Sequence, residues 1–190
     1  MSLLGRLLKN RRSGESDAAW NRPNLAGPEL LTVTSRDFEQ GGSIPLDHCA
    51  KNIGGRNLSP HLAWNPPPEG TAQLLLVIED TDVPTPKPAV HGVFLIDPEV
   101  GELATGGLAA ARAAAGVTVL RAVIGRGYHG PGPIKGHGPH HYTFQLFALA
   151  TRLGTPPGGK APEQARPGAL LSSVAVPVLG RGRLTGTVER

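Results

Sequence analysis

The chain has 190 residues, which is enough for one domain with a substantial core and short for two. Apolar residues make up 39% of it, and 26 glycines with 19 prolines favour many turns and short strands over long helices. The net charge of +4 comes from residues 1–12, which carry four basic side chains and no acid, while the rest is balanced. That balance argues against a nucleic-acid-binding body.

The sequence carries signals about the compartment. Cys49 is the one cysteine, so no internal disulfide forms, as is typical of a reducing environment. The first residues do not resemble a signal peptide, because Gly5 and Arg6 break their apolar run. No stretch of 18 apolar residues occurs, so no transmembrane segment is predicted. We therefore expect a cytoplasmic protein.

The N-terminus has the pattern of a short amphipathic helix. Basic residues lie between and after four leucines at helical spacing, namely Leu3, Leu4, Leu7 and Leu8. Such an arm can pack on its own domain or on a sister subunit of a homodimer, and it can also bind an anionic lipid surface. Residues 12–24 have the composition of a linker. The predicted organisation is an arm and linker over residues 1–24 and one domain over residues 25–190.

The apolar runs beyond the arm predict strands, and the intervening segments are rich in proline and glycine. The strands are expected at residues 29–35, 73–80, 90–97, 116–125, 141–150 and, as an edge strand, 184–189. Residues 109–116 have helix propensity, and a second helix is expected over 162–176, with Pro167 and Gly168 disturbing its early part. The fold class is a mostly antiparallel β domain with minor helices.

Residues 125–130, GRGYHG, match the glycine pattern of a dinucleotide-binding loop. That loop works when its last glycine opens a helix whose N-terminus holds the pyrophosphate. Pro131 and Pro133 follow here, and no acidic residue about 20 positions on is available for a ribose. A nucleotide site is therefore excluded.

Polar side chains gather where the predicted strands begin and end. Asp80 and Asp82 close one strand, His91 opens the next, and His140 with Tyr142 opens the strand after a glycine-rich loop. Singly, each residue is more often structural, since an aspartate before a turn commonly bonds its own backbone. Together they predict a pocket, because strand ends beside irregular loops are where pockets form. A carboxylate beside a histidine favours the charged ring, which can donate to an anion.

Four stretches carry a family resemblance: LSPHLAW (58–64), PPEGT (67–71), EDTDVPTP (79–86) with His91, and GYHGPGPIKGHGPHHY (127–142). In order and spacing they resemble the phosphatidylethanolamine-binding protein family, and its bacterial branch in particular. The resemblance covers about residues 28–190. It implies a sandwich of two packed antiparallel β-sheets, with short peripheral and C-terminal helices and a small anion pocket at one end.

The resemblance also implies the ligand-binding residues, which are Asp80, Asp82, Pro84, His91, Gly132, Pro133, His140 and Tyr142. Of the histidines in residues 136–141, only His140 is expected to face the pocket. His141 replaces an arginine that is usual in the family and should point away. Gly92 replaces a usual aromatic residue, which predicts a wider or weaker pocket, and Thr81 replaces a usual proline.

The resemblance implies a binding protein for a phosphate-like or carboxylate ligand, with a phospholipid headgroup among the candidates. A regulatory or inhibitory role through a protein partner follows from the same resemblance. No cofactor and no nucleic-acid partner are expected.

Two other readings of the same residues remain open. Two carboxylates, two histidines and a tyrosine are adequate for acid–base catalysis on a small molecule, although no nucleophile has a suitable sequence context. Asp80, His91 and His140 also form a two-histidine, one-carboxylate set of the kind that binds a metal ion. A hydrogen-bonded cluster without metal is favoured over that site, because no paired ligand spacing such as H-x-x-x-H occurs.

Overall fold

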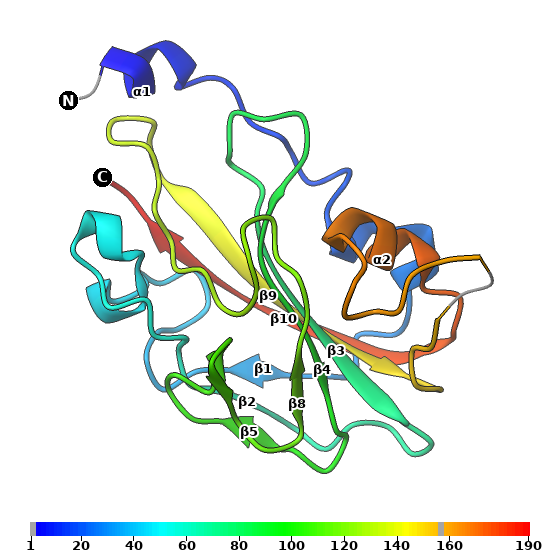
Figure 1. The fold of residues 1–190 in the computed structure, drawn as a ribbon. Coiled ribbons are helices and arrows are strands. Elements are labelled where there is room, and N and C mark those ends of the chain that lie inside the picture. The colour runs from blue at the N-terminus through cyan, green and yellow to red at the C-terminus, as the bar shows by residue number, and fades with distance from the viewer. Residues whose placement is uncertain (1–2, 156–157) are drawn as a thin grey trace.

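The computed structural model describes residues 3–155 and 158–190. Its main element is a five-stranded antiparallel sheet in the order β10-β9-β3-β4-β8 (Figure 1). These strands span β3 Gln73–Asp80, β4 Ala89–Ile96, β8 Val117–Val119, β9 His140–Leu149 and β10 Val178–Val188. A smaller sheet of β1 Val33–Thr34, β2 Leu62–Trp64 and β5 Glu102–Leu103 packs against it, and β6 Leu108–Ala109 pairs with β7 Arg112–Ala113. The predicted mostly antiparallel β-sandwich is confirmed.

The large sheet is covered on both faces, and this explains its continuous apolar strands. Every residue of β3 is buried, and alternate side chains enter two different cores. Leu74 and Leu76 join the core shared with the small sheet. Leu75 and Val77 join a second core, which is closed by α2 (Pro167–Ser173) and by residues 19–25.

The segment whose composition indicates a linker is packed in the structure. Short 3₁₀-helices at Ala19–Asn21 and Pro23–Leu25 bury Trp20 and Leu25 in the second core. Backbone N–H groups also tie the segment to the sheet: Ala19 donates to the Glu79 Oε2 atom at 2.8 Å, and Trp20 to the Gln145 Oε1 atom at 2.7 Å. The domain boundary at residue 24 stays a prediction, but residues 18–25 contribute to the core.

Two local expectations differ from the structure. Residues 109–116 do not form a helix: β6 and β7 make a small hairpin there, because so short a run cannot nucleate a helix and Leu108 is buried in the core. The C-terminal helix does form, and Pro167 begins it instead of breaking it. Proline fits the first helical position, where its missing N–H is not needed. Further 3₁₀-helices lie at Leu46–His48 and Lys51–Ile53.

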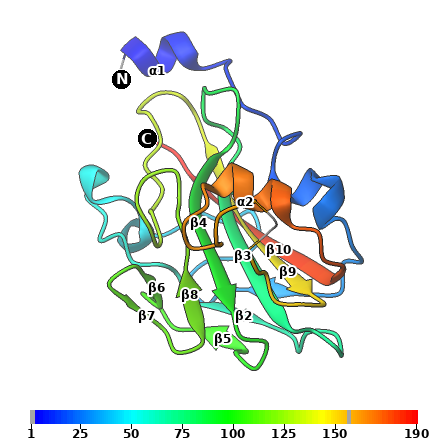
Figure 2. The same ribbon diagram turned by 45° about the vertical axis from the view of Figure 1, so that its right-hand side comes forward.

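The candidate residues meet at one end of the large sheet. Asp80, the last residue of β3, pairs with Ala89 at the start of β4 and with Tyr142 near the start of β9. Loops 81–88 and 131–139 lie over this end, and the first helix, α1 (Leu3–Leu8), lies above them in both views (Figures 1 and 2). In the part of the chain described, no helix has the length and apolarity needed to cross a membrane.

Candidate functional site

The centre of the cluster is a buried carboxylate–histidine pair. The His140 Nδ1 atom lies 2.7 Å from the Asp80 Oδ2 atom, and both side chains are 2% exposed. The second carboxylate oxygen of Asp80 accepts the backbone N–H of Asp82 at 2.8 Å, which forms the turn after β3. The pair is therefore oriented by the strand end and by the turn together.

His137 extends this pair to the N-terminal arm. Its Nδ1 atom lies 2.7 Å from the His140 Nε2 atom. Its Nε2 atom lies 2.8 Å from the carbonyl oxygen of Leu8 and 3.1 Å from that of Arg11. The two imidazoles thus form one hydrogen-bonded chain between an aspartate and the backbone of the arm.

The partners of this chain fix its proton count. Carbonyl and carboxylate oxygens accept, so the His137 Nε2 and His140 Nδ1 atoms each carry a proton. The contact between the rings requires one more proton on one of the two facing nitrogens. Three protons on four ring nitrogens are one more than two neutral imidazoles hold. With Asp80 ionised, the histidine pair therefore carries one positive charge.

The surrounding charges place that proton on His140. The Arg12 Nη1 atom lies 3.3 Å from the His137 Nδ1 atom and can only donate, so this nitrogen is best left as an acceptor. Asp80 lies on the opposite side and attracts a positive charge on His140. With Asp80 ionised, His140 is therefore placed to donate through both nitrogens.

Asp82 is held by cations and donors on the outer side of the cluster. Its Oδ2 atom accepts from the backbone N–H of His141 at 2.7 Å and from the His141 Nδ1 atom at 2.8 Å. Its Oδ1 atom lies 3.5 Å from the Arg12 Nη1 atom. The His141 side chain is about half exposed, so this ring points out of the cluster.

Tyr142 lies between the rings of His140 and His91, in stacked and edge-on arrangements respectively. Burial, with the negative charge of Asp80, raises the pKa of the Tyr142 hydroxyl well above its usual value, so this group stays a donor. Burial lowers the pKa of His91 against the opposing effect of its bond to a carbonyl. Its Nδ1 atom donates to the carbonyl oxygen of His129 at 2.7 Å, which leaves the Nε2 atom as an acceptor.

The proline and glycine positions lie in the loops that surround the cluster. Pro84 is partly buried in the loop after β3, Pro133 is buried, and Gly132 is exposed. The backbone N–H of Gly136 donates to the carbonyl oxygen of Arg190 at 2.7 Å, so it is already satisfied. The space left by Gly92 is not open either, because a Cβ atom there would lie 2.6 Å from the ring of Phe94.

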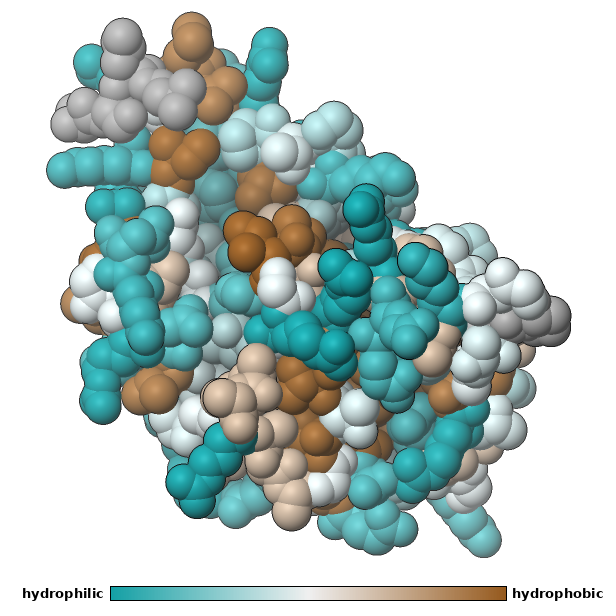
Figure 3. All heavy atoms as spheres, viewed as in Figure 1, coloured by the Kyte–Doolittle hydropathy of each residue, from teal (hydrophilic) through white to brown (hydrophobic). Residues whose placement is uncertain are grey.

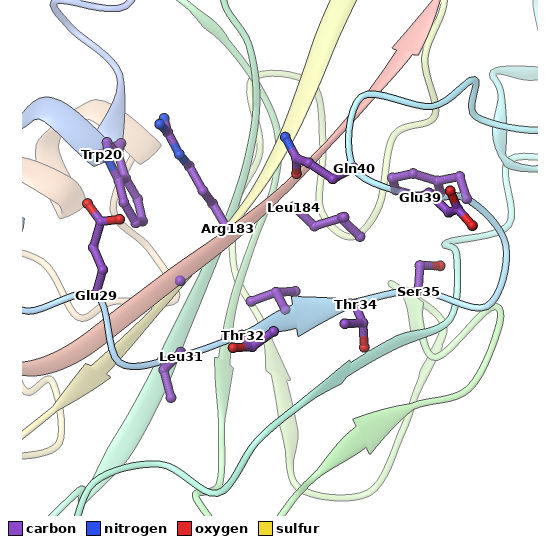
Figure 4. Close-up of a pocket in the computed structure, with 13 residues that line it drawn as sticks. Trp20, Glu29, Leu31, Thr32, Thr34, Ser35, Glu39, Gln40, Arg183 and Leu184 are labelled. Carbon is purple, nitrogen blue, oxygen red and sulfur yellow. The ribbon is translucent and has the colours of Figure 1, made fainter.

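Two cavities were compared with the cluster, and neither is lined by Asp80 or His140. One of about 160 Å³ is lined by His91 and His129 with apolar neighbours, and neither Asp80 nor His140 lines it. A larger open one of about 560 Å³ lies between β1 and β10, walled by Trp20, Leu31 and Arg183 (Figure 4). No histidine lines this groove. Within residues 3–155 and 158–190, no group of three or more histidine, cysteine or acidic side chains is arranged to hold a metal ion.

The comparisons with known proteins agree with this fold. The model of the phosphatidylethanolamine-binding protein family matches residues 34–189. The chain belongs to this family. The bacterial relatives include LppC of Mycobacterium tuberculosis, which is 35% identical over 167 residues, 85% of this chain and 73% of LppC. A UPF0098 protein of Aquifex aeolicus is 36% identical over 135 residues, 70% of this chain and 77% of the relative.

A solved structure of this family also matches. Escherichia coli YbcL, described as a member of the mammalian family, superposes with a TM-score of 0.74 at 27% identity. The match covers 84% of this chain and 98% of YbcL. The bacterial family assignment made from the sequence motifs is confirmed.

The sequence analysis missed two participants in this family member's cluster. His137 was expected outside the pocket, but its ring is fully buried against His140. The spacing His137-x-x-His140 was a usable signal, because residues three apart in a tight loop can meet. Nothing in the sequence except its charge pointed to Arg12, because Arg12 and Asp82 are 70 positions apart in the chain.

Proposed function

We propose that this family member binds a small phosphate-like anion, with phosphate monoesters of the phospholipid-headgroup type as the best fit, at the cluster of Asp80, His140 and Tyr142. The observation that carries the proposal is the hydrogen-bonded chain of Asp80, His140 and His137, in which an ionised Asp80 leaves one more proton on the two rings than two neutral imidazoles hold. A buried cationic imidazolium next to a protonated phenol gives charge-assisted donors, which bind anions more strongly than neutral donors.

The aspartates do not oppose an anion here, because each already has cationic or donor partners. Asp80 accepts from His140 and from the turn backbone. Asp82 accepts from His141 and lies beside Arg12. The negative charges of both carboxylates are therefore balanced by donors and by nearby cationic groups.

His91 supports a ligand that donates as well as accepts. Its neutral ring offers a lone pair at Nε2, and the ring lies against Tyr142, which also stacks with His140. A protonated phosphate oxygen or an ammonium group can donate to this nitrogen, whereas sulfate and a simple carboxylate at neutral pH cannot. The proposed order of affinity is phosphoethanolamine or phosphate above sulfate and acetate.

Calorimetric titration of phosphate, phosphoethanolamine and sulfate tests the proposal. We expect binding of the phosphates to the parent protein and its loss in His140→Ala. His61→Ala is the matched control, because His61 is also a buried histidine beside a carboxylate, that of Glu102 at 3.3 Å, in the small-sheet region. It should keep the parent affinity. Equal phosphate binding by the parent and His140→Ala would exclude this site.

A second measurement does not depend on the variant folding. Histidine-selective ¹⁵N spectra report which ring nitrogens are protonated. We expect both nitrogens of His140 to carry protons and His137 to carry one, on Nε2. A neutral His140 at pH 7 would remove the electrostatic basis of the proposal. The regulatory role, the protein partner and the cytoplasmic location remain predictions.

A further inference from the structure

The N-terminal arm is docked on the loops that cover the cluster. Both ribbon views show α1 above loops 81–88 and 131–139 (Figures 1 and 2). Ser13 donates its hydroxyl to the carbonyl oxygen of Thr81 at 2.7 Å, and the N–H of Gly14 donates to the same oxygen at 3.1 Å. The arm is thus joined to the end of β3 as well as to His137.

Arg12 fastens the arm at several points. Its Nη1 atom donates to the carbonyl oxygens of Asp82 at 3.2 Å and Pro139 at 3.3 Å, and its Nη2 atom donates to that of His137 at 3.4 Å. It also lies 3.5 Å from the Asp82 carboxylate. One guanidinium therefore spans both loops over the cluster.

Gly5 shows how closely the arm approaches. A Cβ atom at this position would lie 2.1 Å from the carbonyl oxygen of Lys135 and 3.0 Å from the backbone nitrogen of His137. These neighbours are backbone atoms, which cannot rotate away. Docking of α1 in this position therefore requires glycine at residue 5.

The docked arm leaves the cationic ring closed to ligands. His140 is 1% exposed and His137 is 0% exposed. The Nε2 atom of His140, its one nitrogen not bonded to Asp80, donates to His137. His137 in turn is held from behind by the carbonyl oxygens of Leu8 and Arg11. An anion can take the Nε2 donor only if His137 moves, and His137 can move only if these arm contacts break.

We propose that residues 5–14 are a strap that closes the candidate anion site, with His137 as the internal occupant that the arm holds on His140. The inference rests on the proposed function and names its regulation. Anion binding and release of the arm are then one linked equilibrium. The free protein is mostly closed, and its apparent affinity for an anion is lowered by the small fraction of open molecules.

The outer face of the docked arm is exposed. Leu7 is 79% exposed, and Arg6, Lys9 and Arg11 are exposed beside it. Figure 3 shows apolar surface next to the first helix at the top of the molecule.

Gly5→Ala in the full-length chain is the sharpest test, because it prevents docking without changing any charge or any residue of the cluster. Gly168→Ala is the matched control: it is also a glycine in a short helix, and a Cβ atom there would meet nothing within 4 Å. Two readouts are needed, calorimetric affinity for inorganic phosphate and the rate of tryptic cleavage after Lys9, Arg11 and Arg12.

We expect Gly5→Ala to speed cleavage of the arm and to raise phosphate affinity by about tenfold or more, because minor open states are usually populated at about 10% or less. Gly168→Ala should match the parent in both readouts. Phosphate should speed cleavage in the parent protein. Faster cleavage in Gly5→Ala with unchanged or weaker phosphate affinity would overturn the strap, and so would unchanged cleavage.

The failure of the proposed function looks different. If neither the parent nor Gly5→Ala binds phosphate while cleavage is faster in Gly5→Ala, the anion assignment fails and closure of the cluster by the arm stands. If the parent protein binds phosphate, the variant His137→Ala gives an independent check. It should raise affinity as Gly5→Ala does, and the double variant should gain little more, because both changes open the same state. Fully additive gains would contradict a single closed state.

Discussion

The Nδ1 atom of His137 and the Nε2 atom of His140 lie 2.7 Å apart, which requires a proton between them. Because the outer nitrogens of both rings already donate to oxygens, the pair holds one proton more than two neutral rings would. The relationship joins a central strand of the sheet to an arm outside the sandwich. The hydrogen bonds of the cluster therefore depend both on Asp80 and on the arm carbonyl groups.

Removing the His140 ring should destabilise the fold as well as abolish binding. The ring is buried and bonded at both nitrogens. His140→Ala leaves Asp80 without its donor, so we expect a loss of about 3 kcal/mol in the free energy of unfolding. Urea denaturation measures it. The exposed neighbour His141→Ala should lose less than about 1 kcal/mol, and equal losses would contradict the buried pair.

Asp80→Asn should also be destabilising, although the side chains are nearly the same size. The amide oxygen can still accept from the N–H of Asp82, but the charge-assisted bond from His140 is replaced by a weaker neutral one from the amide nitrogen to the Nδ1 atom. We expect a loss of about 2–4 kcal/mol in the free energy of unfolding and a neutral His140. Urea unfolding with histidine ¹⁵N spectra checks both. A His140 that remains doubly protonated in this variant would show that Asp80 does not hold its charge.

Glu79→Gln should stabilise the protein at neutral pH. Burial raises the pKa of Glu79 above its ordinary value, against bonds from Gln145 and Ala19 that lower it. The folded state therefore binds the proton more tightly than the unfolded state, and stability falls as pH rises through the interval between the two pKa values. A glutamine oxygen can accept the same two N–H bonds without charge, so we expect a gain on the order of 1 kcal/mol at pH 7. The gain should vanish below about pH 4, where Glu79 is protonated in both states. Urea unfolding of both proteins from pH 4 to 8 measures it, and a constant difference would contradict this origin.

The contribution of His91 to stability should change with pH in the opposite direction. Burial lowers the pKa of its ring, so the unfolded state binds the proton more tightly. Its contribution to stability is present above the unfolded pKa of about 6.5 and is lost as pH falls below that value. His91→Asn keeps a donor for the carbonyl oxygen of His129 but does not titrate. The parent should therefore lose more stability than His91→Asn between pH 7.5 and 5.5, and parallel curves in thermal melts would refute the assignment.

Trp20→Ala tests whether the packed N-terminal segment belongs to the domain. Trp20 is 7% exposed, contacts the ring of Phe147, and lies beneath the guanidinium groups of Arg181 and Arg183 at 4.0 and 4.6 Å. We expect a loss of about 3–4 kcal/mol in the free energy of unfolding. Urea denaturation checks it. A loss below about 1 kcal/mol would restore the view of residues 12–24 as a dispensable linker.

The strands with continuous apolar runs were predictable, and the elements that depend on distant partners were not. Residues 73–80 were predicted as a buried strand, and β3 spans Gln73–Asp80. The expected strand at 116–125 is shortened to β8, Val117–Val119, because only these residues pair with β4. Periodicity reports local burial, and it does not report where neighbouring strands end.

In the candidate site, too, some residues were predictable from the sequence and others were not. The motifs placed Asp80 and His140 together, and the antiparallel register of β3 and β9 makes them neighbours. The role of Arg12 could not be read from the sequence, because the arm has no family motif and its docked position is set by tertiary contacts. The sequence also gave no reason to expect Phe94 in the space beside Gly92.

The packing of residues 18–25 has a consequence for synthesis of the chain. Ala19 bonds to Glu79, 60 positions later, and Trp20 bonds to Gln145, 125 positions later. This segment is therefore synthesised well before its partners, Glu79 and Gln145, exist. Contacts of such long sequence separation form late and slowly, and exposed apolar segments of partly folded chains are prone to aggregate. Folding of this domain should therefore depend on chaperone protection of residues 18–25 until their partners are made.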